Sequence, residues 1–174
     1  GLVRPGEIAV GTDSHTCTYG ALNALAFGIG STDMSGVLLT GQLWLKVPET
    51  LRLIYDGALP PGVYAKDVML HTIGRLGAAG ADYLALHFTG PAIGAMPMSE
   101  RLTVCNMAIE CGAKAGIMDA DAVTLEHFGR AGRDDIAPVS GDAGAPLAGV
   151  IETVCSDLKP QVACPHAVDN VRPV

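Results

Sequence analysis

The sequence predicts an α/β fold, in which short strands alternate with helices and at least some of the strands pair in parallel. Segments with the two-residue period of a strand, such as 49–57, are followed by segments with helical spacing, such as 65–77. The short apolar run at 7–12 also ends in an acid, a hydroxyl and an imidazole: Asp13, Ser14 and His15. Ligands of α/β proteins gather at the carboxyl ends of such strands, so this run is expected to present a site.

The composition is unusually apolar for 174 residues, a length that suits one sizeable domain or two small ones. Hydrophobic residues make up 49% of the chain, and charged residues make up 17% against a typical fraction of about 25%. We therefore expect part of the surface to meet another domain, or the chain to be a piece of something larger.

Charge and cysteine usage exclude several classes of function. The net charge is −7 and no cluster of Lys or Arg occurs, which argues against a nucleic-acid partner. No apolar run reaches the roughly 18 residues of a membrane span, and we expect neither a secretory signal nor a membrane partner. The five cysteines are odd in number and form no CxxC pair, which predicts free thiols in a reducing compartment, the cytoplasm.

The predicted elements follow one another along the chain. Strands are expected at 7–12, 49–57, 82–90 and 115–121. Helices are expected at 19–30, 31–46, 65–77, 98–114 and 121–129. Ser31 or Thr32 is expected to cap the second helix and Ser99 the fourth, which Gly112 should end. From Gly129 onward the chain is rich in Gly, Pro, Asp and Ala, and its weak periodicity predicts a linker.

The triplet at 13–15 has two interpretations. Adjacent residues on a strand point to opposite faces, so Asp13, Ser14 and His15 cannot form a hydrolase triad among themselves. In a turn beyond the strand end, however, backbone amides and all three side chains can converge on one small anion. Alternatively, Asp13 or Ser14 caps the next helix and His15 is incidental.

Asn106 and Glu110 are the second candidate pair. Their i, i+4 spacing predicts that they project from the same helical face. A carboxylate on this otherwise apolar helix favours a partner, and His15 is available. A carboxylate bonded to one imidazole nitrogen makes the other nitrogen a better proton acceptor, which is the usual acid–base pairing. The alternative is an ordinary solvated helix face.

Three stretches together resemble a known family. GTDSHTCTYGALNALAFGIGSTDM, GVYAKDV and RLTVCNMAIECGAKAGI occur in this order, and the resemblance runs from about Ile8 to about Asn170. They are similar to the aconitase superfamily, most of all to the large subunits of 3-isopropylmalate dehydratases and homoaconitases. The motifs DSHT and NMxxE are far more specific jointly than either is alone.

The resemblance implies a hydro-lyase for hydroxylated di- or tricarboxylic acids such as 3-isopropylmalate or homocitrate. The chemistry would use a [4Fe-4S] cluster, one iron of which binds the substrate hydroxyl and carboxylate. Ser14 would contact a substrate carboxylate, and His15 would lie near the leaving hydroxyl, polarised by Glu110. Asp13 would pair with a further histidine or the iron-bound water. Asn106 would lie beside the cluster and help to bind the substrate.

The sequence departs from the family pattern at the cluster. It contains neither a GSCTN segment nor a CxxC pair, so the resemblance implies that the cluster ligands lie outside this chain. Cys17, Cys105 and Cys164 do not match ligand positions, and no metal ligand is assigned. His87 stands where relatives usually carry Glu and is interpreted as a core or surface histidine. A zinc or thiol enzyme centred on His15 and Cys17 is a further hypothesis.

The resemblance also implies how the chain is organised. Residues 1–48 would end a first aconitase-like three-layer α/β/α domain, 49–130 would form a second, and 131–174 would lead toward a third. The expected partners are the remaining large-subunit domains and a small subunit, and we expect the isolated chain to be inactive. The alternative is a non-catalytic binding or assembly module that keeps the fold.

Overall fold

Three sheets organise the protein in the computed structural model, which describes residues 3–133 and 135–174. Their strands are β1 (Ile8–Gly11), β2 (Leu25–Gly28), β3 (Thr50–Asp56), β4 (Ala85–Thr89), β5 (Ala115–Met118), β6 (Gly149–Val154), β7 (Gln161–Ala163) and β8 (Val171–Pro173). The helices are η1 (Ser14–Leu22), α1 (Ser31–Thr40), α2 (Ala65–Leu76), α3 (Pro91–Ala95), α4 (Met98–Asn106), η2 (Met107–Cys111), α5 (Ala122–Arg130) and η3 (Cys155–Asp157). The η elements are 3₁₀ helices.

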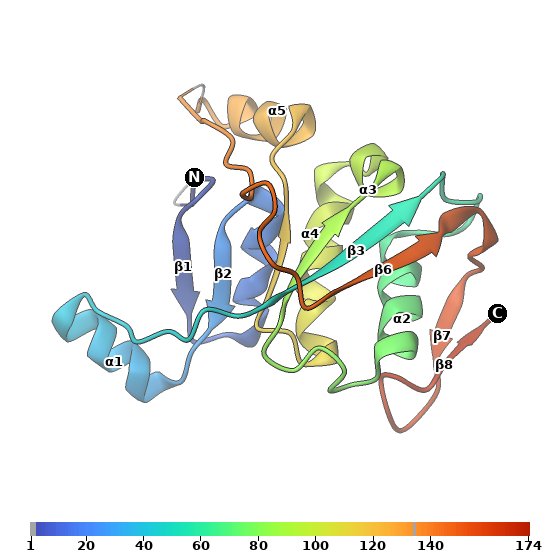
Figure 1. Cartoon of the computed structure of the whole chain (residues 1–174), viewed down its shortest axis with the longest axis horizontal. Helices are drawn as coiled ribbons and strands as arrows, with labels where there is room; N and C mark the ends of the chain where they lie inside the picture. Colours follow the sequence, from blue (N-terminus) through green and yellow to red (C-terminus); the bar gives the residue numbers. More distant parts are fainter. Residues whose placement is uncertain (1–2, 134) are drawn as a thin grey trace.

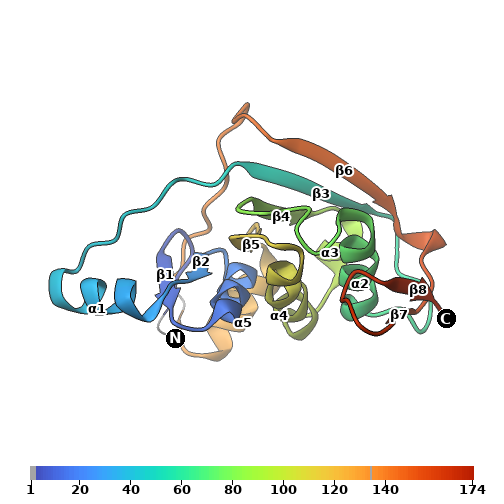
Figure 2. The same ribbon diagram turned by 90° about the horizontal axis from the view of Figure 1, so that it is seen from below.

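The largest sheet has the strand order β5-β4-β3-β6, and every pairing in it is parallel. On β3, Leu51, Leu53 and Tyr55 are buried, whereas the alternate residues Arg52 and Ile54 are partly exposed. This two-residue alternation places the apolar side chains on one face, where α2 and α4 cover the sheet (Figures 1 and 2). No helix of the described residues covers the opposite face in Figure 2. The predicted α/β class is confirmed.

The small parallel sheet β1-β2 differs from the expectation for 19–30. A helix was expected there, but η1 ends at Leu22 and Asn23 takes a left-handed conformation with φ 63°. The chain then enters β2, whose Leu25 lies opposite Ile8 of β1. The expectation was wrong because a short apolar run such as LAFG can be a strand or part of a helix, and only its long-range partner decides.

The remaining helix predictions hold in part. Helix α2 ends at Leu76, and Gly77 takes a positive φ of 85°, as its stop signal predicts. The helix expected at 31–46 ends at Thr40, since Gly41 turns left-handed with φ 68°. Neither Ser31 nor Thr32 is its N-cap, because Gly30 occupies that position without a side-chain bond.

The helix expected at 98–114 is divided. Pro97 is its N-cap instead of Ser99, and after Asn106 the chain tightens into the 3₁₀ helix η2. Gly112 ends that helix with φ 84°, as predicted. Met107 caps α4 and begins η2, so the two helices are continuous along the chain.

The segment after Gly129 contains more regular structure than its weak periodicity indicates. Strand β6 pairs with β3 and thereby extends the large sheet, and β7 and β8 form an antiparallel pair. Weak structure was expected here because Gly and Pro dominate the approach to β6, whereas the strand itself is fixed by its pairing with β3. The division into domains at 48 and 130 stays a prediction.

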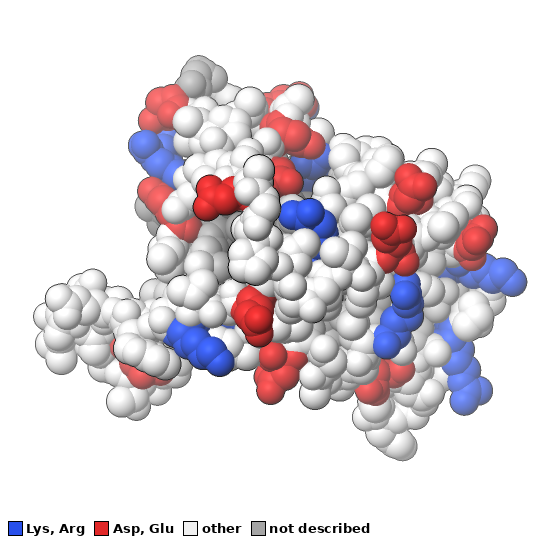
Figure 3. All heavy atoms as spheres, in the orientation of Figure 1, with Lys and Arg blue, Asp and Glu red and all other residues white. Residues whose placement is uncertain are grey.

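The surface combines scattered charges with an exposed apolar helix, α1. Positive and negative side chains are interspersed on the face in Figure 3, and the projecting part that holds α1 is mostly uncharged there. Helix α1 buries none of its residues, and Leu38 and Leu39 are 80% and 86% exposed. Within 3–133 and 135–174, no helix is both long enough and apolar enough to cross a bilayer.

Candidate active site

The turn after β1 builds the first half of the site. Asp13 is the N-cap of η1, and its Oδ1 accepts a hydrogen bond of 2.7 Å from the backbone N–H of His15. The hydroxyl of Thr16 donates to the carbonyl oxygen of Asp13 at 2.6 Å. These two bonds fix the turn, so the side chains of Asp13, Ser14 and His15 lie together at the strand end.

The capping alternative and the site interpretation are therefore compatible. Asp13 does cap η1, yet its Oδ1 also lies 3.2 Å from Nδ1 of His15. The Oγ of Ser14 lies 3.4 Å from the same nitrogen. The backbone and ring bonds from His15 lower the pKa of the Asp13 carboxyl, so this exposed group stays ionised.

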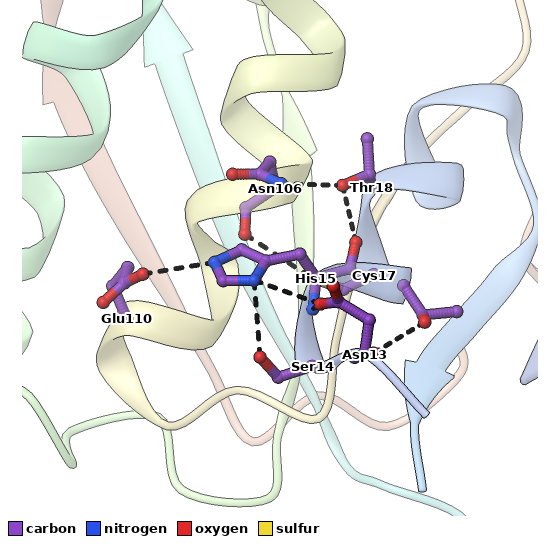
Figure 4. Close-up of polar contacts among 8 residues, drawn as sticks. Asp13, Ser14, His15, Cys17, Thr18, Asn106 and Glu110 are labelled. Carbon is purple, nitrogen blue, oxygen red and sulfur yellow. Dashed lines mark hydrogen bonds and ion pairs between the residues drawn. The ribbon is translucent and has the colours of Figure 1, made fainter. Parts of the chain in front are cut away.

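Glu110, which is distant in the sequence, contacts the imidazole of His15. Its Oε1 lies 3.4 Å from Nε2 of His15, across 95 residues of chain (Figure 4). The imidazole thus lies between two carboxylates, Asp13 at one nitrogen and Glu110 at the other. The side chains of His15 and Glu110 remain 44% and 38% exposed, so the ring is open to a small molecule.

Asn106 contacts the same turn through Thr18, a residue that the motifs do not identify as part of the site. Its Nδ2 donates to Oγ1 of Thr18 at 2.9 Å, and that hydroxyl donates to the carbonyl oxygen of His15 at 2.6 Å (Figure 4). Thr18 follows His15 by three residues, one turn of a 3₁₀ helix. That spacing is the signal that could have identified it.

Ser14 lines a pocket of about 300 Å³. Its wall is formed by the ends of β1 and β2 together with Tyr83, Ile109 and Lys114. Lys114 is the only cation among the lining residues, and its Nζ lies 4.4 Å from the centre of the Phe27 ring. Burial lowers the pKa of its ammonium group. His15 and Glu110 do not line this pocket, but Nδ1 of His15 lies 3.4 Å from Oγ of Ser14, which does.

The cysteine side chains do not fit the role of cluster ligands. Cys17, Cys105, Cys111 and Cys155 have no exposed surface. The thiol of Cys17 donates to the carbonyl oxygen of Asn106, and burial raises its pKa to about 11. Among the described residues, no three His, Cys, Asp or Glu side chains gather in a way that could hold a metal ion. We therefore derive no chemical step through a cluster from these residues.

His87 has a specific partner as well. Its Nε2 lies 3.0 Å from Oδ2 of Asp119, which follows β5. Its interpretation as a core or surface histidine is thus incomplete, because the imidazole is only 16% exposed and is paired. This pair belongs to a different pocket from Ser14.

The α/β fold is consistent with an aconitase-type protein, and the family model for aconitase (aconitate hydratase) matches residues 1–174. The chain belongs to the aconitase family. It is similar to the 3-isopropylmalate dehydratase large subunit of Desulfatibacillum aliphaticivorans, with 53% identity. It is 54% identical to the probable 3-isopropylmalate dehydratase large subunit of Methanothermobacter thermautotrophicus. Both matches cover 100% of this chain and 42% of the relative, so the chain spans about two fifths of the length of these relatives.

Proposed function

We propose that the chain is part of a hydro-lyase that removes and adds water on a hydroxylated di- or tricarboxylic acid. The relatives named as 3-isopropylmalate dehydratase large subunits favour 3-isopropylmalate as the substrate, with homocitrate as the alternative. The observation that carries the proposal is the meeting of His15 with Glu110 at 3.4 Å, beside the Ser14 hydroxyl.

The imidazole of His15 is the proton donor in this proposal. Glu110 accepts a hydrogen bond from Nε2–H and orients the ring, and the Asp13 carboxylate lies beside Nδ1. Nδ1 then gives its proton to the hydroxyl oxygen as the C–O bond breaks, so that water leaves and the bonding pair departs with the oxygen. The carbon-bound proton goes to a base outside this chain, and its electron pair forms the new C=C bond.

Ser14 and Asn106 bind and position the substrate in this proposal. Ser14 lines the pocket of about 300 Å³, which suits a small acid, and Lys114 of the same lining supplies a positive charge. Asn106 holds the turn through Thr18 and keeps its amide close to the ring. The [4Fe-4S] cluster, which binds the substrate hydroxyl and carboxylate in this family, is proposed to be held by cysteines outside this chain.

The rest of a longer polypeptide is the proposed partner of α1. Besides Leu38 and Leu39, the side chains of Trp44 and Val47 are 84% and 78% exposed. Strands β1 and β2 form a parallel sheet of only two strands, whereas parallel sheets are ordinarily larger and covered on both faces. Since the relatives are more than twice as long, we propose that their remaining large-subunit domains cover these surfaces and that a small subunit completes the enzyme.

The test of the catalytic proposal uses the assembled enzyme that contains this chain. His15→Asn and Glu110→Gln are expected to lower kcat by about 10²–10⁴-fold, the usual contribution of a positioned acid–base group. His127→Asn is the matched control, because His127 is exposed in the last turn of α5. Unchanged kcat in His15→Asn would refute the proposal. The chain by itself, after iron–sulfur reconstitution, is expected to show no turnover.

A non-catalytic assembly module is the second candidate function, favoured by the exposed apolar surface of α1. It predicts binding of partner chains without loss of activity in His15→Asn. Gel filtration with the partner chains, combined with the kcat measurement, separates the two candidates. The free cysteines are consistent with the proposed cytoplasmic location, since all five carry unpaired thiols.

A further inference from the structure

A second and larger pocket lies on the face of the β5-β4-β3-β6 sheet that no described helix covers. Its volume is about 410 Å³. Its floor consists of residues of the sheet. Gly6, Asn23 and Leu25, near the starts of β1 and β2, line one side, and residues 139–142 and 145–147 line the remaining side. It shares no lining residue with the pocket at Ser14, so it is independent of the proposed catalytic function.

Arg52 lies at this floor, and one of its side-chain nitrogens is buried without a hydrogen-bond partner. It lies in register with His87 on β4, which lies in register with Ile117 on β5, so the three side chains form one row across the sheet. Nε of Arg52 is buried without a hydrogen-bond partner, and the side chain makes no ion pair with any other described residue. A buried cationic donor without a partner is unfavourable, and an anion placed beside it relieves that cost.

The neighbouring acids are already engaged or lie at the margin. Oδ2 of Asp119, which follows β5 and lines the same pocket, lies 3.0 Å from His87, and Asp119 makes no ion pair with Arg52. Asp142 is exposed and lines the pocket from the covering segment. The pocket therefore carries the positive guanidinium of Arg52 and the negative carboxylate of Asp142. This combination favours a ligand with a single carboxylate over a dianion.

Besides the polar residues Asn23, Thr50 and Ser140, the lining includes apolar side chains that would contact the body of a ligand. Leu25, Ile117, Val139 and Leu147 contribute hydrocarbon surface around the guanidinium. The volume falls within the roughly 300–1,000 Å³ of small-molecule sites, far more than an inorganic ion needs. We propose that this pocket binds a small organic acid with one carboxylate and an apolar body, whose carboxylate pairs with Arg52.

The test is a titration of the 174-residue chain with 3-methylbutanoate, followed by ¹H–¹⁵N NMR. Saturable shifts are expected at the amides of Arg52, His87 and Ile117. The uncharged 3-methylbutanamide and the dianion 3-methylglutarate are each expected to bind at least tenfold more weakly. Arg52→Gln should raise the Kd for 3-methylbutanoate at least tenfold, whereas Arg172→Gln, an equal loss of charge on exposed β8, should leave it unchanged.

Three outcomes overturn the proposal: no saturable shift at these amides, equal Kd values for the acid and its amide, or an unaltered Kd in Arg52→Gln. If Arg52→Gln does not fold, Asp142→Asn tests the proposal instead. This variant removes a negative charge that repels the ligand carboxylate, and it leaves the sheet unchanged. That variant is expected to lower the Kd for 3-methylbutanoate, and an unchanged or higher Kd contradicts the assignment.

Discussion

Replacing Gly28 with alanine tests whether the 13–15 turn must pack tightly against β2 for the His15–Glu110 contact to form. A Cβ at Gly28 would lie 2.8 Å from the Cα of Ser14 and 2.9 Å from the carbonyl oxygen of Asp13. Both neighbours are backbone atoms, and carbon atoms in contact ordinarily stay at least about 3.5 Å apart. The turn or the strand must therefore shift by roughly 0.7 Å to accept one methyl group.

This displacement has two measurable consequences. Overpacking of this kind costs about 1–3 kcal/mol of the free energy of unfolding, which urea denaturation measures. Nε2 of His15 and Oε1 of Glu110 are already 3.4 Å apart, so we expect a displacement of the turn to weaken or break this contact. The ¹⁵N and ¹H signals of the His15 ring should then move toward those of the Glu110→Gln variant.

Gly36→Ala is the matched control for this experiment. Gly36 lies within α1, and a Cβ there would have no atom within 4 Å. Because alanine is preferred to glycine inside a helix, this variant should be more stable by about 0.5–1 kcal/mol, with unchanged His15 signals. If Gly28→Ala matched the wild-type stability and ring signals, close packing of β2 against the turn would not be what positions the imidazole.

Three further predictions concern stability and thiol reactivity. Arg101 is 1% exposed and donates two hydrogen bonds to Asp121, so Arg101→Met should cost about 3–5 kcal/mol in urea unfolding, against less than about 0.5 kcal/mol for the exposed Arg130→Met. Equal losses would contradict the burial argument. Arg101 lowers the pKa of Asp121 in the folded state, so its contribution is present above the unfolded-state pKa and is lost as the pH falls through the lower, folded-state pKa. The free energy of unfolding, measured from pH 6 downward, should therefore decline less steeply in Asp121→Asn than in the wild type. Parallel curves would refute the coupling between Arg101 and the titration of Asp121. Because burial raises the pKa of Cys17 to about 11, iodoacetamide at pH 8 should label Cys164 first, and early labelling of Cys17 would contradict its burial.

The sequence predicts the elements whose apolar pattern is long and regular. β3 and α2 are such cases, because the two-residue alternation of Leu51, Leu53 and Tyr55 and the helical stripe of 65–77 each face one core. β2 and β6 could not be assigned in this way. Each is a short run whose identity depends on pairing with a strand far away in the sequence, and local composition carries no information on that partner.

The contact between His15 and Glu110 could be predicted from the sequence, whereas the form of the helix that carries Glu110 could not. The spacing of Asn106 and Glu110 indicates a common face only on an α-helix, and the helix tightens to the 3₁₀ form immediately after Asn106. In η2, with about 3.0 residues per turn, a spacing of four residues exceeds one turn. Both side chains nevertheless contact η1, Asn106 at Thr18 and Glu110 at His15, and their roles in a site stay a prediction.

The contacts instead form because two helical segments run side by side in opposite directions. Thr18, the later residue of η1, bonds Asn106, and His15, the earlier one, bonds Glu110, the later residue of the α4–η2 pair. Close packing of η1 against β5 holds this arrangement, since a Cβ at Gly20 would lie 1.5 Å from the carbonyl oxygen of Gly116. The imidazole and the carboxylate are thus placed by backbone contacts between three separate elements. A substitution at Gly20 should consequently disturb the proposed acid–base pair as severely as one at Glu110 itself, although Gly20 carries no functional group.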